Sequence, residues 1–181
     1  MRRKTLDLLL IWVGVLLVAM LAVAGTGLLI GYSFTTSQVR SQLVEQKVFF
    51  PTASQPDYRD LVAAHLTQYA GQQVLTGSQA QIFANDIIGV DTKAISGGQT
   101  YAQLSAASLK DPSNTQLANQ VETVFRGDTL RGLLLNAYAF GFIGVIALYA
   151  AIASFALGIL MLFLVLLGVR HYRQVEPTVE I

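Results

Sequence analysis

Few residues in this sequence have the types and spacing that catalysis or metal binding requires. His65 is the only histidine in the polar middle of the chain, and a metal ion would need further ligands beside it. Asp57 and Asp60 precede His65 by eight and five residues, which does not gather the three side chains on one helix face. We therefore expect no catalytic residue, no metal site and no cofactor, and we predict that the chain is not an enzyme.

Neither a nucleophile loop, a phosphate-binding loop nor a reactive thiol is indicated by the sequence. Ser96-Gly97-Gly98 resembles a nucleophile or phosphate-binding loop in composition, but it lacks the lysine and the strand–turn–helix context of such loops. We expect it to be a linker between helices. The chain has no cysteine, which excludes disulfides, thiolate metal ligands and thiol nucleophiles.

Two long apolar runs enclose the polar residues of the 181-residue chain. Leu8–Tyr32 and Gly132–Val169 contain no charged residue, and each exceeds the roughly 20 residues that cross a hydrocarbon core about 30 Å thick. Because the second run is longer than one crossing needs, we place its crossing at Val145–Val169 and expect Leu130–Phe140 to pack in the outer domain. The predicted order is a cytoplasmic flank (1–7), a transmembrane helix (8–32), an extracytoplasmic helical domain (33–135), a second transmembrane helix with an outer extension (136–169) and a cytoplasmic tail (170–181).

Basic residues flank both runs and predict the topology. Short flanks rich in Lys and Arg stay in the cytoplasm, and the flanking residues are Arg2, Arg3, Lys4, Arg170 and Arg173. We therefore expect a protein of the cytoplasmic membrane with both termini inside, the central domain outside and the lipid bilayer as its first partner. The net charge of +1 argues against a nucleic-acid partner.

A cleaved signal peptide is the main alternative for the first run. Ala22-Val23-Ala24 would be an acceptable cleavage site after a basic flank and an apolar segment. The apolar run continues through Ile30 and Gly31, however, which gives it spanning length. We favour an uncleaved anchor and leave cleavage open.

Small residues recur at helical spacing within both runs. Such residues let membrane helices approach closely, and close packing drives association in lipid. The predicted helix-packing residues are Ala24, Gly27 and Gly31 in the first run and Gly144, Ala147, Ala151, Ser154 and Gly158 in the second. The partner is left open: it is either the other run of the same chain or a neighbouring protein.

The polar middle has the pattern of a small helical bundle, so the predicted fold class is all-α. Apolar residues recur at helical spacing from Tyr58 to Tyr69, and no segment alternates as a strand does. Ser78 and Thr100 are expected to cap helices, and Asp111-Pro112 is expected to begin the helix that leads into the second run.

Three segments of the middle region carry a resemblance to a family. These are Tyr69–Val74, Ser96–Tyr101 and Phe125–Tyr138, of which the last is the most specific. Over most of its length the chain resembles uncharacterised two-span membrane proteins of actinomycetes. The resemblance implies an all-helical outer domain in a Gram-positive cytoplasmic membrane and offers no catalytic residue to carry over.

Two functions fit these observations. The first is a non-enzymatic membrane subunit or scaffold, which packs against other membrane subunits or a second copy of itself and docks an extracytoplasmic partner. The alternative is a ligand-binding or sensory protein, with an apolar pocket lined by Tyr58, Tyr69, Phe83 and Tyr101. An enclosed cavity of several hundred Å³ would distinguish the alternative from the first.

Overall fold

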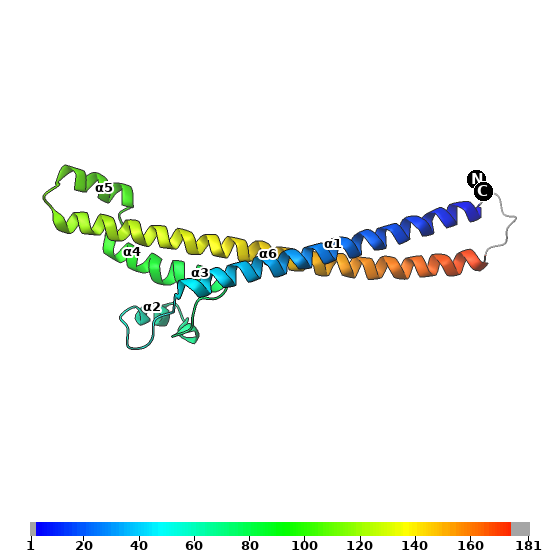
Figure 1. The fold of residues 1–181 in the computed structure, drawn as a ribbon, viewed down its shortest axis with the longest axis horizontal. Helices are drawn as coiled ribbons and strands as arrows, with labels where there is room; N and C mark the ends of the chain where they lie inside the picture. Colours follow the sequence, from blue (N-terminus) through cyan, green and yellow to red (C-terminus); the bar gives the residue numbers. More distant parts are fainter. Residues whose placement is uncertain (1–2, 175–181) are drawn as a thin grey trace. The chain divides into compact units, whose positions relative to one another are not determined.

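The computed structural model describes residues 3–174, and these are helical with no β-strand among them. They divide into two compact units, one comprising residues 3–34 and 144–174 and the other Thr35–Ile143. Both long helices contribute residues to both units. In chain order the elements are α1 (Arg3–Gln46), α2 (Tyr58–Ala63), the 3₁₀-helix η1 (Thr67–Tyr69), α3 (Gly77–Ile82), the π-helix η2 (Phe83–Ile88), α4 (Gly89–Ser96), α5 (Tyr101–Lys110) and α6 (Thr115–Gln174) (Figure 1).

The first unit is a pair of apolar helices that contact each other along a regular seam. Its covered positions recur at alternating intervals of three and four residues, the 3.5-residue repeat of helices that pack side by side. On α1 they include Asp7, Ile11, Gly14, Val18, Leu21 and Gly25, and on α6 Ala151, Ser154, Gly158, Met161, Val165 and Gly168. Each helix therefore presents one narrow face to the other.

The remaining surface of this unit is apolar and uncovered. Only 11% of the most apolar 18-residue window of α1 or α6 is buried within the chain. Val23 and Ile159, for example, are 74% and 70% exposed. By length and composition, both helices are able to cross a membrane.

The second unit has a hydrophobic core centred on Phe50. This side chain is 1% exposed and lies against the rings of Tyr69 and Phe83, with centroid distances of 5.2 and 5.4 Å. Leu43 from α1 and Leu134 from α6 are buried in the same cluster, so both long helices contribute to the core. Of the segment 130–140, which we expected to pack in this domain, Leu134 is buried, whereas Leu130, Leu133 and Phe140 are more than half exposed.

Backbone pairing fixes the two loops that reach this core. Phe50 N donates to the Gln72 carbonyl oxygen over 2.9 Å, and Val74 N donates to the Val48 carbonyl oxygen over 2.9 Å. An isolated bridge between Phe49 and Gln73 lies between these bonds. The pairing satisfies backbone groups beside the core without forming a strand.

Two expected helix starts are wrong and one is confirmed. Thr76, not Ser78, caps α3, because Thr76 and Gln79 complete a reciprocal capping box. Asn114, not Asp111, caps α6, since its side-chain oxygen accepts from Leu117 N over 3.0 Å. Thr100 caps α5 as expected, again with a capping box.

The helix expected between Tyr58 and Tyr69 is also interrupted. It divides into α2 and η1 at His65, whose φ of 57° is outside the helical region.

Candidate functional site

The seam of the first unit is held by a hydrogen bond at its centre. Ser154 Oγ on α6 donates to the Leu21 carbonyl oxygen on α1 over 2.9 Å, and Ser154 is 8% exposed. Ala151, one turn earlier, is completely buried. A hydroxyl bonded across two helices has no need of water, which suits an apolar environment.

Two glycines of α1 make room for side chains of α6. A methyl group built on Gly14 would lie 2.5 Å from Val165 Cγ2, and one on Gly25 would lie 2.8 Å from Phe155 Cζ. At Gly158 the nearest atom would be Leu21 Cβ at 3.6 Å, an ordinary contact distance. The tightest packing therefore depends on glycine in α1 and on larger side chains in α6.

The structure brings part of the predicted small-residue set to this seam. Ala151, Ser154 and Gly158 lie on it, Gly144 is buried and Ala147 is half-buried.

Two of the predicted residues of α1 lie off this seam. Ala24 and Gly27 are exposed, and a methyl group added at Gly27 would meet no atom within 4 Å. Gly31 is half-buried. Sequence reasoning missed Gly14 and Gly25, although their separation of eleven residues, about three helical turns, places them on one face.

The basic flanks that predict topology are only partly described. Arg2 lies outside the described residues, and α1 begins at Arg3. Lys4 Nζ lies 5.9 Å from the centroid of the Tyr172 ring, which puts the start of α1 beside the end of α6. Arg170 and Arg173 are exposed on α6.

Asp7 and His171 line a small cavity near these ends. The cavity has a volume of about 210 Å³, and its other lining residues are apolar side chains and two glycines. Asp7 Oδ2 is buried and has no hydrogen-bond partner among the described residues.

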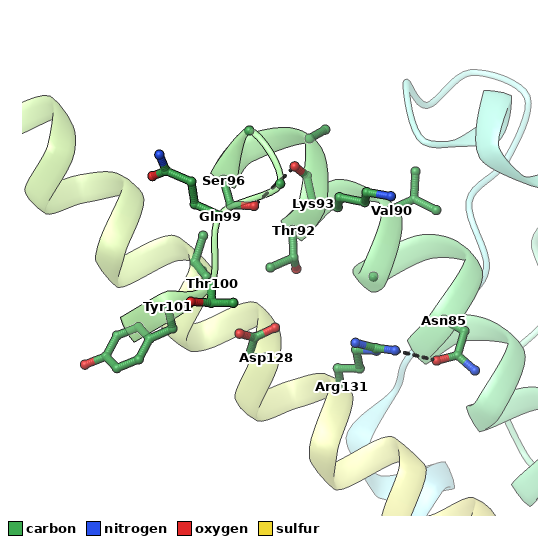
Figure 2. A pocket seen from close by; sticks show the side chains of 15 residues that line it. Asn85, Val90, Thr92, Lys93, Ser96, Gln99, Thr100, Tyr101, Asp128 and Arg131 are labelled. Atoms are coloured by element: carbon green, nitrogen blue, oxygen red, sulfur yellow. Dashed lines mark hydrogen bonds between the residues drawn. The ribbon is translucent and has the colours of Figure 1, made fainter. Parts of the chain in front are cut away.

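The second unit contains a larger and more polar cleft, of about 940 Å³. It lies between α4, the loop that follows it, the start of α5 and α6 (Figure 2). Its polar lining side chains are those of Asn85, Thr92, Lys93, Ser96, Gln99, Thr100, Tyr101, Asp128 and Arg131. The cleft is open to solvent and is not the enclosed apolar pocket considered from the sequence.

A π-helix places Asn85 beside this cleft. Residues 77–96 form one uninterrupted helical segment, α3–η2–α4, of which η2 is the π-helical part. Ala80 of α3 and Ala84 and Ile87 of η2 face the hydrophobic core. Asn85, Gly89 and Thr92 face the cleft instead. π-Helical turns occur frequently at functional sites, because they change which side chains share a face.

Thr92, which lines the cleft, packs against Gly127 of α6. A methyl group on Gly127 would lie 2.5 Å from Thr92 Oγ1, so the Thr92 side chain occupies the space that a β-carbon would need. Thr92 Oγ1 itself donates to the Ile88 carbonyl oxygen over 2.7 Å. Glycine at position 127 thus makes room for this side chain between α4 and α6.

The Ser96-Gly97-Gly98 segment ends α4 and lines the same cleft. Gly97 adopts the left-handed conformation with φ of 60°, and Gly98 has φ of 79°. Ser96 is buried, and its Oγ donates to the Lys93 carbonyl oxygen over 3.2 Å. The segment connects two helices, as the sequence predicts, and it also forms part of the cleft wall.

The aromatic residues considered for a pocket are divided between the core and the cleft. Tyr58, Tyr69 and Phe83 pack against the core cluster. Only Tyr101 lines the cleft, and its ring lies 5.5 Å from that of Phe125.

Burial, together with acidic residues near the start of α2, raises the pKa of the Asp91 carboxyl group. Burial raises the pKa of Asp91, and the negative charges of Asp57 and Asp60 raise it further, whereas Arg59 lowers it. Asp60 is 9% exposed, and its Oδ2 accepts no hydrogen bond from a described residue. Ionised Asp91 therefore costs the folded domain free energy at neutral pH.

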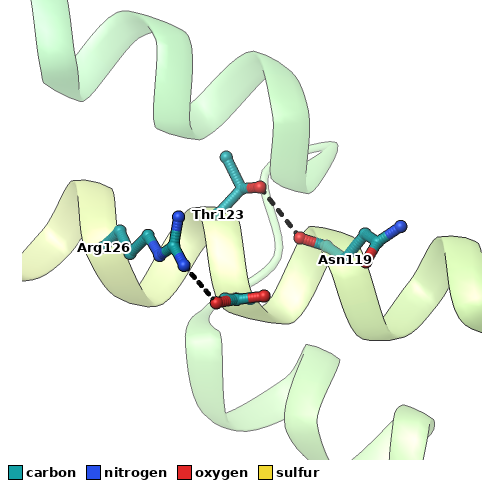
Figure 3. A network of polar contacts seen from close by, with 4 residues as sticks. Asn119, Thr123 and Arg126 are labelled. Carbon is teal, nitrogen blue, oxygen red and sulfur yellow. Dashed lines mark hydrogen bonds and ion pairs between the residues drawn. The ribbon is translucent and has the colours of Figure 1, made fainter.

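A second polar network lies on the exposed first turns of α6, outside the cleft (Figure 3). Arg126 pairs with Glu122 one turn earlier, and Thr123 Oγ1 donates to the Asn119 carbonyl oxygen over 2.8 Å. Both contacts are within the helix, and such exposed pairs contribute little stability. The network is a solvated surface and provides a control for the cleft residues.

Comparison with known proteins adds no family. No protein-family model, curated protein or solved structure matches this chain. The resemblance to two-span membrane proteins of actinomycetes therefore stays a prediction.

Proposed function

We propose that the chain is a non-enzymatic integral membrane subunit or scaffold with both termini in the cytoplasm. The two apolar helices support a membrane location by their length and uncovered surface. The contact between Lys4 and Tyr172 places the basic flanks at the same end of the helix pair. By the positive-inside rule that end is cytoplasmic, and Thr35–Ile143 then lies outside.

Cysteine labelling tests this topology directly, because the chain has no cysteine of its own. In intact cells, a membrane-impermeant maleimide should label Leu109→Cys, whose wild-type side chain is 79% exposed in the outer domain. Arg173→Cys should react only after the membrane is permeabilised. Labelling of both positions in intact cells, or an N-terminus cleaved after Ala24, would contradict the proposed topology.

One observation carries the scaffold proposal. One face of α1 packs against α6, and another face of α1 remains uncovered by the chain. Gly25 and Ser154 are used in the internal seam. A shallow apolar groove of about 420 Å³ lies elsewhere on α1, lined by Ala22, Val23, Thr26, Gly27 and Ile30. We assign this open face, which includes the predicted packing residue Gly27, to other membrane subunits or to a second copy of the chain.

The two faces predict different consequences for substitutions two residues apart. Gly27→Leu should fill the open groove, so native mass spectrometry after mild extraction should show loss of the partner without loss of thermal stability. Gly25→Leu should lower the thermal stability of the chain itself. A wild-type chain that is monomeric in native membranes, as judged by chemical crosslinking, would argue decisively against a scaffold.

A second function, a ligand-binding outer domain, is supported by the cleft between α4 and α6. Its volume of about 940 Å³ lies within the range of small-molecule sites. A thermal-shift screen of small molecules against the full chain tests this function. It requires a ligand whose effect disappears when the cleft is obstructed by Val90→Trp, at a lining residue whose side chain is exposed.

A further inference from the structure

The cleft contains a guanidinium group, that of Arg131, which forms no ion pair among residues 3–174. Arg131 Nη2 donates to Asn85 Oδ1 over 3.0 Å, and Asn85 is neutral. Arg131 Nε is buried without an acceptor among the described residues. Within residues 3–174, no carboxylate oxygen forms an ion pair with this guanidinium, since the ion pairs there involve Arg59 and Arg126. A partly buried cation without an anion is unfavourable, which points to a partner from outside the chain.

The surrounding residues position this guanidinium. Gly89 lies above it: a methyl group there would stand 3.5 Å from Arg131 Nε and 3.7 Å from its Cζ. Asn85 holds its far side from η2. Figure 2 shows Arg131 and Asp128 projecting from α6 toward α4. The side chain is therefore held at the cleft, where the terminal N–H groups of the guanidinium, and not the buried Nε, are the donors that a ligand can reach.

The rest of the lining favours a small anion. Lys93 supplies a second positive charge, and Asp128 is the only carboxylate among the lining residues. The capped start of α5, at Thr100 and Tyr101, also borders the cleft, and the first turn of a helix carries partial positive charge. Arginine is the side chain best suited to bind carboxylate or phosphate oxygens in pairs.

We propose that the cleft binds a small polar molecule through an oxyanion group, a carboxylate or a phosphate, held by Arg131. This inference rests on the second proposed function and specifies its ligand class. Asp128, one turn before Arg131, is positioned to accept a hydrogen bond from a hydroxyl or amine of the same molecule.

Calorimetric titration of the full chain in phosphatidylcholine nanodiscs tests the inference, with inorganic phosphate, acetate and glycerol 3-phosphate as probes. We expect saturable binding of at least one probe. Arg131→Gln, which keeps a donor for Asn85, should weaken it about tenfold or more, because a hydrogen bond to a charged group is lost. Arg126→Gln is the matched control, since Arg126 lies on the same helix and pairs with Glu122 outside the cleft.

Two further variants keep the test informative if Arg131→Gln does not fold. Lys93→Gln should weaken phosphate binding severalfold, and Asp128→Asn should strengthen it by removing repulsion. Replacing phosphatidylcholine with phosphatidylglycerol shows the source of the oxyanion: competition with phosphate indicates a lipid headgroup, and no competition indicates a free molecule.

Several results would overturn the inference. Absence of saturable binding at millimolar probe concentrations is one, and equal weakening by Arg131→Gln and Arg126→Gln is another. Binding of only neutral or cationic molecules in the thermal-shift screen would refute the oxyanion assignment and leave the ligand-binding function standing.

Discussion

Gly25→Ala provides the sharpest test of the internal seam. In the structure its new methyl group would lie 2.8, 2.9 and 3.1 Å from three carbons of the Phe155 ring. Favourable carbon–carbon contact begins at about 3.5 Å, so the ring or the helix must move by about 0.7 Å. Overpacking of this kind costs about 1–3 kcal/mol. For a chain of this size we expect the melting temperature to fall by about 2–10 °C.

Gly27→Ala is the matched control for this experiment. It makes the same change two residues along the same helix, where the new methyl group meets no atom within 4 Å. Both substitutions gain up to about 1 kcal/mol of helix propensity, so their difference isolates the clash with Phe155.

Circular dichroism melts in one detergent provide the measurement. Adding Phe155→Leu to Gly25→Ala should recover part of the loss, and the double-mutant cycle then measures the coupling between the two positions. Equal melting temperatures for Gly25→Ala and Gly27→Ala would show that Gly25 does not face Phe155 and would refute the seam.

Three further predictions concern the seam, a charge and a cap. Leu21→Cys with Gly158→Cys should form an intrachain disulfide on mild oxidation, because the two β-carbons would be 3.6 Å apart. The control pair, Leu21→Cys with Ile159→Cys, should not form one. Mobility on non-reducing gels distinguishes the two double variants. Asp91→Asn should raise the melting temperature at pH 7. The raised pKa of Asp91 means that the folded state gives up this proton at higher pH than the unfolded state, so the wild-type penalty grows as pH rises above about 3.8 and the gain should vanish below that pH. Thr100→Val should cost about 1 kcal/mol, seen as easier unfolding of α5 in hydrogen exchange, because the cap of α5 is lost.

The sequence predicted the helical class and the elements whose determinants are local. The apolar runs appear in α1 and α6, and the Thr100 cap is where its side chain and Gln103 predict it. Thr76 was missed because Ser78 is also a good capping residue. The choice between them depends on Gln79, which lies three residues after Thr76 and completes a capping box there.

The candidate sites were less predictable because their determinants are non-local. The small residues of α6 lie on the seam, but periodicity alone did not distinguish the face of Gly25 from that of Gly27; the ring of Phe155 on the other helix makes that distinction. The cleft joins Asn85 to Arg131 across 46 residues, and neither has a motif around it. Only tertiary packing brings these two side chains together.

The π-helix η2 makes one segment of the second unit tolerant of a change in length. A π-turn accommodates an additional residue within a helix, so deletion of one residue from Phe83–Ile88 would let residues 77–96 continue as a regular α-helix. The side chains after the deletion would keep their facing, because the turn that held the extra residue is what disappears. Gly89 and Thr92 would stay at the cleft and Ala80 in the core. Deletion of one residue from the regular turns of α4 would instead rotate every later side chain of that helix by about 100°. The two single-codon deletions should therefore differ, the first keeping the cleft and the second disrupting it.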